Sequence, residues 1–138
     1  KYIGDSVMIF FGDPETAGKN KDALNCVKMA IEMQNTMKKL SIELMNDFNL
    51  SIPLNIRVGI HSGECTVGNF GSEKRLDYTV IGRTVNLASR LESNSPVGQI
   101  LVSEKTRSLI NDEINCKKYD EIKVKGFKDK IGTFIPNF

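Results

Sequence analysis

The 138-residue sequence predicts an α+β fold in which helices pack on a mixed, mostly antiparallel sheet. Short runs with the two-residue alternation of strands recur along the chain, often without a helix between them. Three other segments have the 3.6-residue spacing of helices. The resulting order is β-β-α-β-β-β-α-β-α-β-β, with no internal repeat and no interdomain linker. We therefore expect a single domain over residues 1–138.

The first two strands are predicted on either side of a turn at Gly4-Asp5-Ser6. Glycine and aspartate between apolar runs favour such a turn. Residues 7–11 are apolar at every position, which is typical of a central strand with both faces covered. The segment Gly12-Asp13-Pro14 ends this run, and a polar loop follows.

The clearest helix is predicted over residues 22–46. Its apolar residues step by three and four along one face, which we expect to pack on the sheet. The methionines in this stripe suit a docking surface or core packing, and their helical spacing favours the core. The stripe consists of Cys26, Ala30, Met33, Met37, Leu40 and Leu44.

The rest of the chain divides into shorter elements. Residues 52–61 alternate between an apolar and a polar face, as expected of a strand. A helix over residues 84–92 turns its apolar side chains inward and ends before an Asn-Ser-Pro segment. Ser103 can cap a further helix that ends near residue 111. The remaining strands are predicted at residues 65–70, 77–81, 99–102, 119–125 and 132–136.

Composition and charge exclude several classes of function. The net charge of +2 is too small to indicate nucleic-acid binding, and no basic run is interleaved with aromatic residues. No stretch has the roughly 18 apolar residues that span a bilayer. Cys26, Cys65 and Cys116 lack metal-ligand spacing, so we expect reduced thiols and a cytoplasmic location. The start of the chain has no signal peptide. Because it opens without an initiator methionine and goes directly into strand-like sequence, we expect a piece of a longer polypeptide.

Asn86 and Arg90 are the strongest candidate pair for binding an anion. They lie four residues apart in a predicted helix, so their side chains share one face and can reach the same group. A solvated helix face has the same pattern. Arg57 lies on the polar face of its strand. This position suits a phosphate ligand and equally an ordinary solvated arginine. Residues 123–128, Lys-Val-Lys-Gly-Phe-Lys, concentrate positive charge around a glycine, which suits a polyphosphate or a solvated turn.

Asp5 and His61 are the candidates for metal or acid–base chemistry. A carboxylate in a tight turn can bind Mg²⁺, which prefers one or two carboxylates together with phosphates and water. Aspartate is also a common turn residue for purely structural reasons. His61 is the only histidine, and it begins a His-Ser-Gly-Glu segment. We interpret it as structural, since no Ser-His-Asp arrangement is implied.

Taken together, these segments resemble the catalytic domain of the class III nucleotidyl cyclases, the adenylate and guanylate cyclases. Residues 1–8 resemble the metal-binding hairpin of the family, and residues 57–63 resemble its central strand. Residues 77–82 and 84–90 resemble its signature strand and helix. The resemblance covers nearly the whole chain and implies a ferredoxin-like sheet with helices packed on it.

The resemblance implies an adenylate cyclase that converts ATP to 3′,5′-cyclic AMP and pyrophosphate in signal transduction. Lys1 and Thr79 occupy the two positions that read the purine. This pair is similar to that of bacterial and of soluble bicarbonate-responsive adenylate cyclases. Enzymes that read guanine usually carry Glu and a small residue such as Cys at these positions.

The same resemblance assigns the groups that contact ribose and phosphates. Asn86 would orient the ribose, and Arg90 would stabilise the charge that builds on the α-phosphate. Arg57 and one of two lysines, Lys125 or Lys128, would hold the outgoing pyrophosphate. Lys128 is only weakly preferred over Lys125, because the turn is spaced differently from the usual Val-Lys-Gly-Lys pattern of the family.

The resemblance also implies two metal ions, Mg²⁺ or Mn²⁺, and a head-to-tail homodimer with two shared sites. Asp5 is similar to one of the two metal-binding aspartates. The other aspartate lies on an earlier strand of the family, and we expect the chain to lack that strand and its helices. The metal aspartates come from one chain, and the residues that read purine, ribose and α-phosphate come from the other. A regulatory sensor is expected elsewhere in the same polypeptide.

Two alternatives remain beside adenylate cyclase. One is a guanylate cyclase, and the other is a non-catalytic module for dimerisation or nucleotide sensing. A diguanylate cyclase is disfavoured because the chain has no Gly-Gly-Asp/Glu-Glu-Phe segment. Arg83 stands where many relatives carry Asp or Asn, and the sequence assigns it no role.

Overall fold

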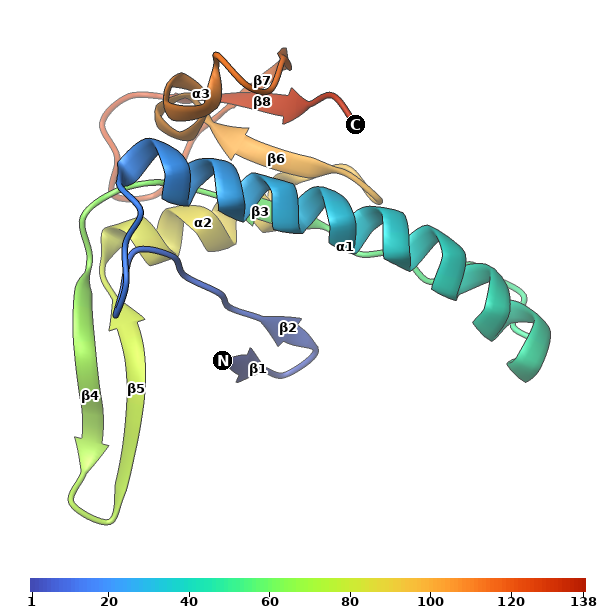
Figure 1. Ribbon diagram of the computed structural model, residues 1–138, viewed down its shortest axis with the longest axis horizontal. Helices are drawn as coiled ribbons and strands as arrows, with labels where there is room; N and C mark the ends of the chain where they lie inside the picture. Colours follow the sequence, from blue (N-terminus) through green and yellow to red (C-terminus); the bar gives the residue numbers. More distant parts are fainter.

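The computed structural model describes residues 1–138 and has eight strands and three helices (Figure 1). Their order is the one predicted from the sequence, although several ends shift by a few residues. The bounds are β1 Tyr2–Ile3, β2 Ser6–Val7, α1 Lys19–Phe48, β3 Val58–Ile60, β4 Thr66–Ser72, β5 Arg75–Ile81, α2 Arg83–Asn94, β6 Ile100–Ser103, α3 Glu104–Ile110, β7 Cys116–Ile122 and β8 Ile131–Pro136.

A four-stranded sheet in the order β3-β6-β8-β7 forms the centre of the domain. β3 and β6 are parallel, whereas β6–β8 and β7–β8 are antiparallel. The pairs β1–β2 and β4–β5 form two separate antiparallel hairpins, and β4–β5 projects away from the sheet (Figure 1). The predicted mixed, mostly antiparallel α+β arrangement is confirmed.

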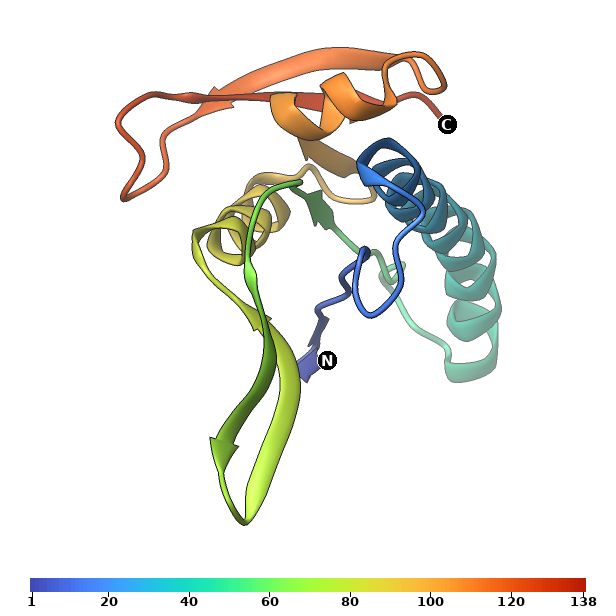
Figure 2. The ribbon, with the colours of Figure 1, turned by 60° about the vertical axis from the view of Figure 1, so that its left-hand side comes forward.

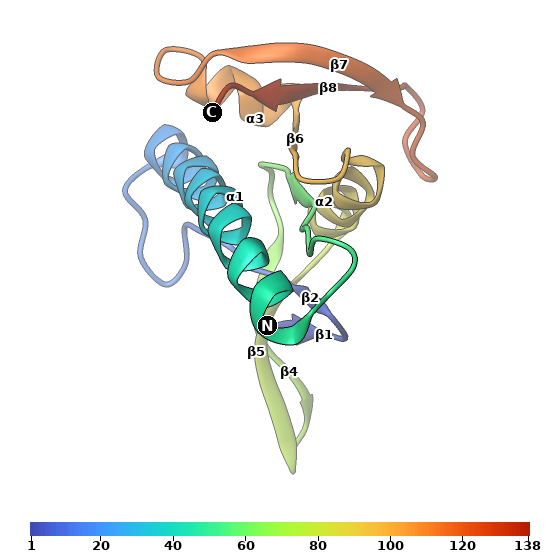
Figure 3. The same ribbon diagram turned by 90° about the vertical axis from the view of Figure 1, so that its right-hand side faces the viewer.

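Helices cover both faces of the sheet, with α1 and α2 on opposite sides of β3 (Figure 2, Figure 3). The sequence of β6 explains how one strand packs against helices on both faces of the sheet. Ile100 and Val102 pack with α1 and α3, while Leu101 packs with Leu87 and Leu91 of α2. Successive strand residues point to opposite faces, so an unbroken apolar run suits a strand covered on both sides. The prediction that the two leucines of α2 face inward is confirmed.

The apolar stripe predicted for α1 is only partly buried. The helix exists, but Ala30 is the only fully buried residue of the stripe. The buried residues of α1 are Ala23, Leu24, Val27, Ala30, Gln34 and Ser41. Met33 and Met37 are half-buried, and Leu40 is 41% exposed. The C-terminal half of α1 extends beyond the sheet (Figure 1), so its apolar residues have no strand beneath them. The prediction that both methionines belong to the core is therefore wrong.

Two predicted strands also differ from the structure. The strand expected over residues 52–61 is reduced to β3. Just before β3 and β6, the buried side-chain amide of Gln34 donates to the carbonyl oxygens of Ile56 and Gln99, at 3.2 and 3.1 Å. Residues 7–11 do not form a central strand with covered faces. Only Val7 belongs to β2, whose ladder partner is β1, and Val7 is 49% exposed.

Candidate functional site

The hairpin β1–β2 brings the predicted purine-reading lysine to β5. The Lys1 ammonium lies 3.3 Å from Oδ2 of Asp77. Thr79 is two residues further along the same strand and therefore on the same face as Asp77. Thr79 is buried, with 5% of its surface exposed. An exposed ion pair of this kind contributes about 0.2–1 kcal/mol, so Lys1 is free to exchange Asp77 for a ligand.

Asp5 is exposed in the turn between β1 and β2. The preceding residue, Gly4, has a φ of 62° in the same turn. No three His, Cys, Asp or Glu side chains lie close enough together to hold a metal ion. The carboxylate of Asp5 suits a hard cation such as Mg²⁺, which also accepts phosphate oxygens and water as ligands.

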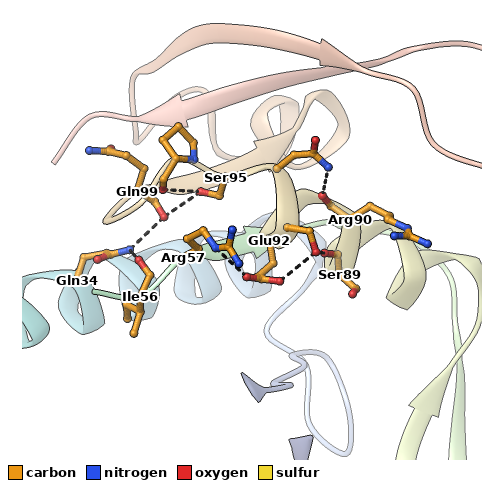
Figure 4. Close-up of polar contacts among 11 residues, drawn as sticks. Gln34, Ile56, Arg57, Ser89, Arg90, Glu92, Ser95 and Gln99 are labelled. Carbon is orange, nitrogen blue, oxygen red and sulfur yellow. Dashed lines mark hydrogen bonds and ion pairs between the residues drawn. The ribbon is translucent and has the colours of Figure 1, made fainter. Parts of the chain in front are cut away.

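Asn86 and Arg90 lie one helical turn apart on α2, and both are exposed. α2 begins directly after β5 through Gly82, whose φ of 136° suits only glycine. Because the connection is a single residue, the helix face with Asn86 is tied closely to the strand with Thr79. The guanidinium of Arg90 points away from the neighbouring ion pair on the helix (Figure 4). Arg90 has no ion-pair partner, so its charge is available to an anion.

Arg57 lies at the opposite end of α2 from the basic loop between β7 and β8. Its Nε lies 3.3 Å from Oε1 of Glu92, in the last turns of the helix (Figure 4). The loop with Lys125 and Lys128 contacts Arg83, the first residue of α2. Nine residues of helix correspond to about 14 Å. Arg57 and the lysine loop therefore contact opposite ends of α2.

Arg83 is the residue of this region that sequence reasoning left without a role. Its guanidinium donates a hydrogen bond to the carbonyl oxygen of Gly126 and lies 5.0 Å from the centre of the Phe127 ring. Lys125 and Lys128 are both exposed on either side of this contact, and neither forms an ion pair. The choice between the two lysines stays open.

His61 is part of a hydrogen-bonded group between β3, β6 and α3. Its Nδ1 lies 2.8 Å from Oγ of Ser103, which also caps α3 by accepting from the amide of Thr106 at 3.3 Å. Burial lowers the pKa of His61 from 6.5 to about 4, and the nearby charge of Lys105 adds to this effect. The imidazole is therefore neutral at pH 7 and serves to hold the ends of β3 and β6, in agreement with the structural interpretation.

We expect the stability of the protein to fall as the pH decreases from 6.5 to 4. The unfolded chain binds a proton on His61 in this window and the folded chain does not, so protonation favours unfolding. The expected loss is about 1 to 2 kcal/mol, reduced from the full shift because the ring is partly exposed. Urea unfolding at pH 7 and pH 5 measures it. In His61→Asn, the free energy of unfolding should differ less between pH 7 and pH 5. An equal difference in the wild type and the variant would contradict this assignment.

The three cysteines are free thiols. Burial raises the pKa of Cys26 to about 11, so its thiol stays protonated at neutral pH. None of the three helices is long and apolar enough to cross a membrane.

Comparison with known proteins places these features in a family context. Residues 1–137 match the adenylate and guanylate cyclase catalytic domain. The structure of the adenylyl cyclase CyaB from P. aeruginosa is 50% identical and has a TM-score of 0.95, over 100% of this chain and 70% of that chain. The structure of the guanylyl cyclase Cya2 is 35% identical, with a TM-score of 0.82, over 91% of this chain and 62% of that chain.

A curated relative shows how much of a longer protein such a chain represents. The terminal-differentiation specific adenylate cyclase of Dictyostelium discoideum is 32% identical, over 97% of this chain and 6% of that protein. The chain thus spans a small part of this relative and about two thirds of the two solved structures.

Proposed function

Because the chain belongs to the class III nucleotidyl cyclase family, in the part described as the adenylate and guanylate cyclase catalytic domain, we propose that it is the catalytic domain of an adenylate cyclase. The reaction is attack of the ribose 3′-oxygen of ATP on the α-phosphorus, which forms cyclic AMP and releases pyrophosphate. The single observation that carries the choice of adenine is the position of Lys1 beside the strand of Thr79. The 50% identity to an adenylyl cyclase supports the same choice.

The purine is read by one donor and one acceptor. The Lys1 ammonium donates to N1 of adenine, and the Thr79 hydroxyl accepts from the 6-amino group. Guanine presents a donor at N1 and an acceptor at O6, so it would leave this pair mismatched. Where the bound base excludes water, a polar group left unpaired costs about 1–3 kcal/mol, which is enough to discriminate between the two bases.

Asn86 and Arg90 act on the sugar and the reacting phosphate. The amide of Asn86 orients the ribose so that the 3′-oxygen lies in line with the α-phosphorus. The guanidinium of Arg90 stabilises the negative charge that develops on the α-phosphate oxygens, and its lack of an ion-pair partner suits this role. Two divalent cations, held in part by Asp5, would activate the 3′-oxygen and neutralise the leaving group.

The separation of the phosphate-binding cations supports a site shared between two chains. Arg57 and the loop of Lys125 and Lys128 contact opposite ends of α2, about 14 Å apart. Contacts at opposite ends of the helix suit two separate sites better than one pyrophosphate site. In a head-to-tail homodimer, Arg57 and Asp5 serve one site, while the lysine loop, Asn86 and the purine-reading residues serve the other. Free thiols agree with a cytoplasmic location for this domain.

The test is the identity of the product formed by the full-length protein from ATP and from GTP, with Mg²⁺ or Mn²⁺. We expect cyclic AMP from ATP, and a shift of preference toward GTP when Lys1→Glu is combined with Thr79→Cys. Lys74→Glu, in the exposed turn between β4 and β5, is the charge-matched control and should change neither preference. Formation of cyclic GMP alone would refute the purine assignment, and the absence of both products would favour a non-catalytic module.

A further inference from the structure

The N-terminal residue of α2 holds the basic loop between β7 and β8, two segments more than 40 residues apart in the sequence. The Arg83 guanidinium donates to the carbonyl oxygen of Gly126 and lies 5.0 Å from the centre of the Phe127 ring. A guanidinium is suited to this double contact because its planar fork can bond a carbonyl while its face lies over an aromatic ring. Neither contact depends on a bound ligand.

The loop is anchored to the core beneath this contact. Phe127 is half-buried against the cluster of Leu87, Leu91, Leu101, Ile122 and Val124. Its amide donates to the carbonyl oxygen of Val124 at 3.0 Å, which closes a turn. Gly126 has a φ of 90°, a conformation that favours glycine. The ring of Phe127 and the turn are therefore fixed, and Arg83 joins them to the start of α2.

The contact places the basic loop on the face of α2 that carries the candidate catalytic residues. Arg83, Asn86 and Arg90 are spaced i, i+3 and i+7, which puts them along one side of the helix. Lys125 and Lys128 each lie one residue outside the pair Gly126-Phe127 that Arg83 holds. Moving this loop would move both lysines relative to Asn86 and Arg90.

We propose that Arg83 is a positioning residue, which holds the loop of Lys125 and Lys128 beside Asn86 and Arg90 so that the α-phosphate and the outgoing pyrophosphate are bound together. This proposal rests on the proposed cyclase function. Displacements of about 1 Å in a catalytic arrangement can cost about a hundredfold in rate. We therefore expect Arg83→Ala to lower kcat/KM for ATP by about ten- to a hundredfold.

The first measurement concerns the loop alone and requires no catalysis. Hydrogen exchange at the Phe127 amide is compared in the full-length protein and in Arg83→Ala, Arg83→Lys and Arg75→Ala variants. We expect exchange to become about tenfold faster in Arg83→Ala, and less so in Arg83→Lys, which keeps the charge but loses the planar fork. Arg75→Ala, at the exposed start of β5, is the matched control and should resemble the wild type. Unchanged exchange in Arg83→Ala would overturn the proposal.

The second measurement links the loop to phosphate. Pyrophosphate inhibition of cyclic AMP formation should weaken about tenfold in Arg83→Ala, with partial recovery in Arg83→Lys. A second substitution, Lys125→Ala or Lys128→Ala, should add little to Arg83→Ala if the lysine acts through the held loop. Faster exchange with unchanged inhibition would overturn the role in phosphate binding. Cyclic AMP formation by the wild-type protein tests the proposed function separately.

Discussion

Arg90→Ala is expected to lower kcat by about a hundred- to a thousandfold, the usual cost of removing one charged group that stabilises a transition state. The free energy of unfolding should hardly change, because the Arg90 side chain is exposed and has no ion-pair partner in the folded chain. Its backbone carbonyl, which accepts from the side-chain Nδ2 of Asn94 at 2.7 Å, is retained in the variant. Steady-state kinetics with ATP and urea unfolding measure the two effects.

The control for Arg90→Ala is Arg75→Ala, which removes an equally exposed guanidinium from β5. This variant should lose less than about twofold in kcat, since a distant surface charge acts only through screened electrostatics. For Arg90→Ala, a rise in KM with an unchanged kcat would indicate that Arg90 contributes only ground-state binding. Full activity of Arg90→Ala would show that the residue belongs to an ordinary solvated helix face.

Gly59→Ala is expected to destabilise the domain by about 3 kcal/mol, at the upper end of the usual cost of overpacking. A Cβ at Gly59 would overlap the backbone nitrogen of Glu92 and approach the carbonyl oxygen of Ala88 at 2.5 Å. These are backbone atoms of α2, so no side chain can turn away to make room. The gain of about 0.5–1 kcal/mol that alanine brings by restricting the backbone is too small to offset this clash. A midpoint shift in urea unfolding measures the effect.

Gly59→Ala should also reduce activity, because the helix that must shift carries Asn86 and Arg90. Gly68→Ala is the matched control, since its Cβ would meet nothing nearer than a Phe70 ring carbon at 3.8 Å. That contact is an ordinary one, and we expect a change in stability within about 0.5 kcal/mol. A Gly59→Ala protein as stable as the wild type would show that α2 packs less closely on β3 than described.

The order of elements could be predicted because each leaves a local periodic signal. The strand β6 and the helix α2 have apolar patterns that match their final burial, and Ser103 caps α3 as its position suggested. The burial of α1 could not be predicted in the same way. Its apolar stripe is longer than the sheet that it crosses. In addition, the side chain of Gln34 is buried and hydrogen-bonded, whereas hydropathy alone would predict that the neighbouring methionines are buried instead.

The candidate site shows the same division between local and distant signals. The pair Asn86 and Arg90 follows from helical spacing, and both residues lie exposed on α2. The contact of Arg83 with Gly126 could not be predicted, because it joins segments 43 residues apart and depends on how β7 and β8 pack on α2. The sequence identifies Arg57 as a candidate phosphate ligand, but only the structure shows that its guanidinium faces Glu92.

The central claim is that this domain builds a cyclase site from two chains, and mixing two inactive variants tests it most directly. Asp5→Ala removes the carboxylate offered to the metal, and Arg90→Ala removes the charge offered to the α-phosphate. Random pairing of the two full-length variants gives mixed dimers in half of the cases, each with one intact and one doubly altered site. We therefore expect cyclic AMP formation at about a quarter of the wild-type rate. A mixture as inactive as either variant alone would contradict the shared site.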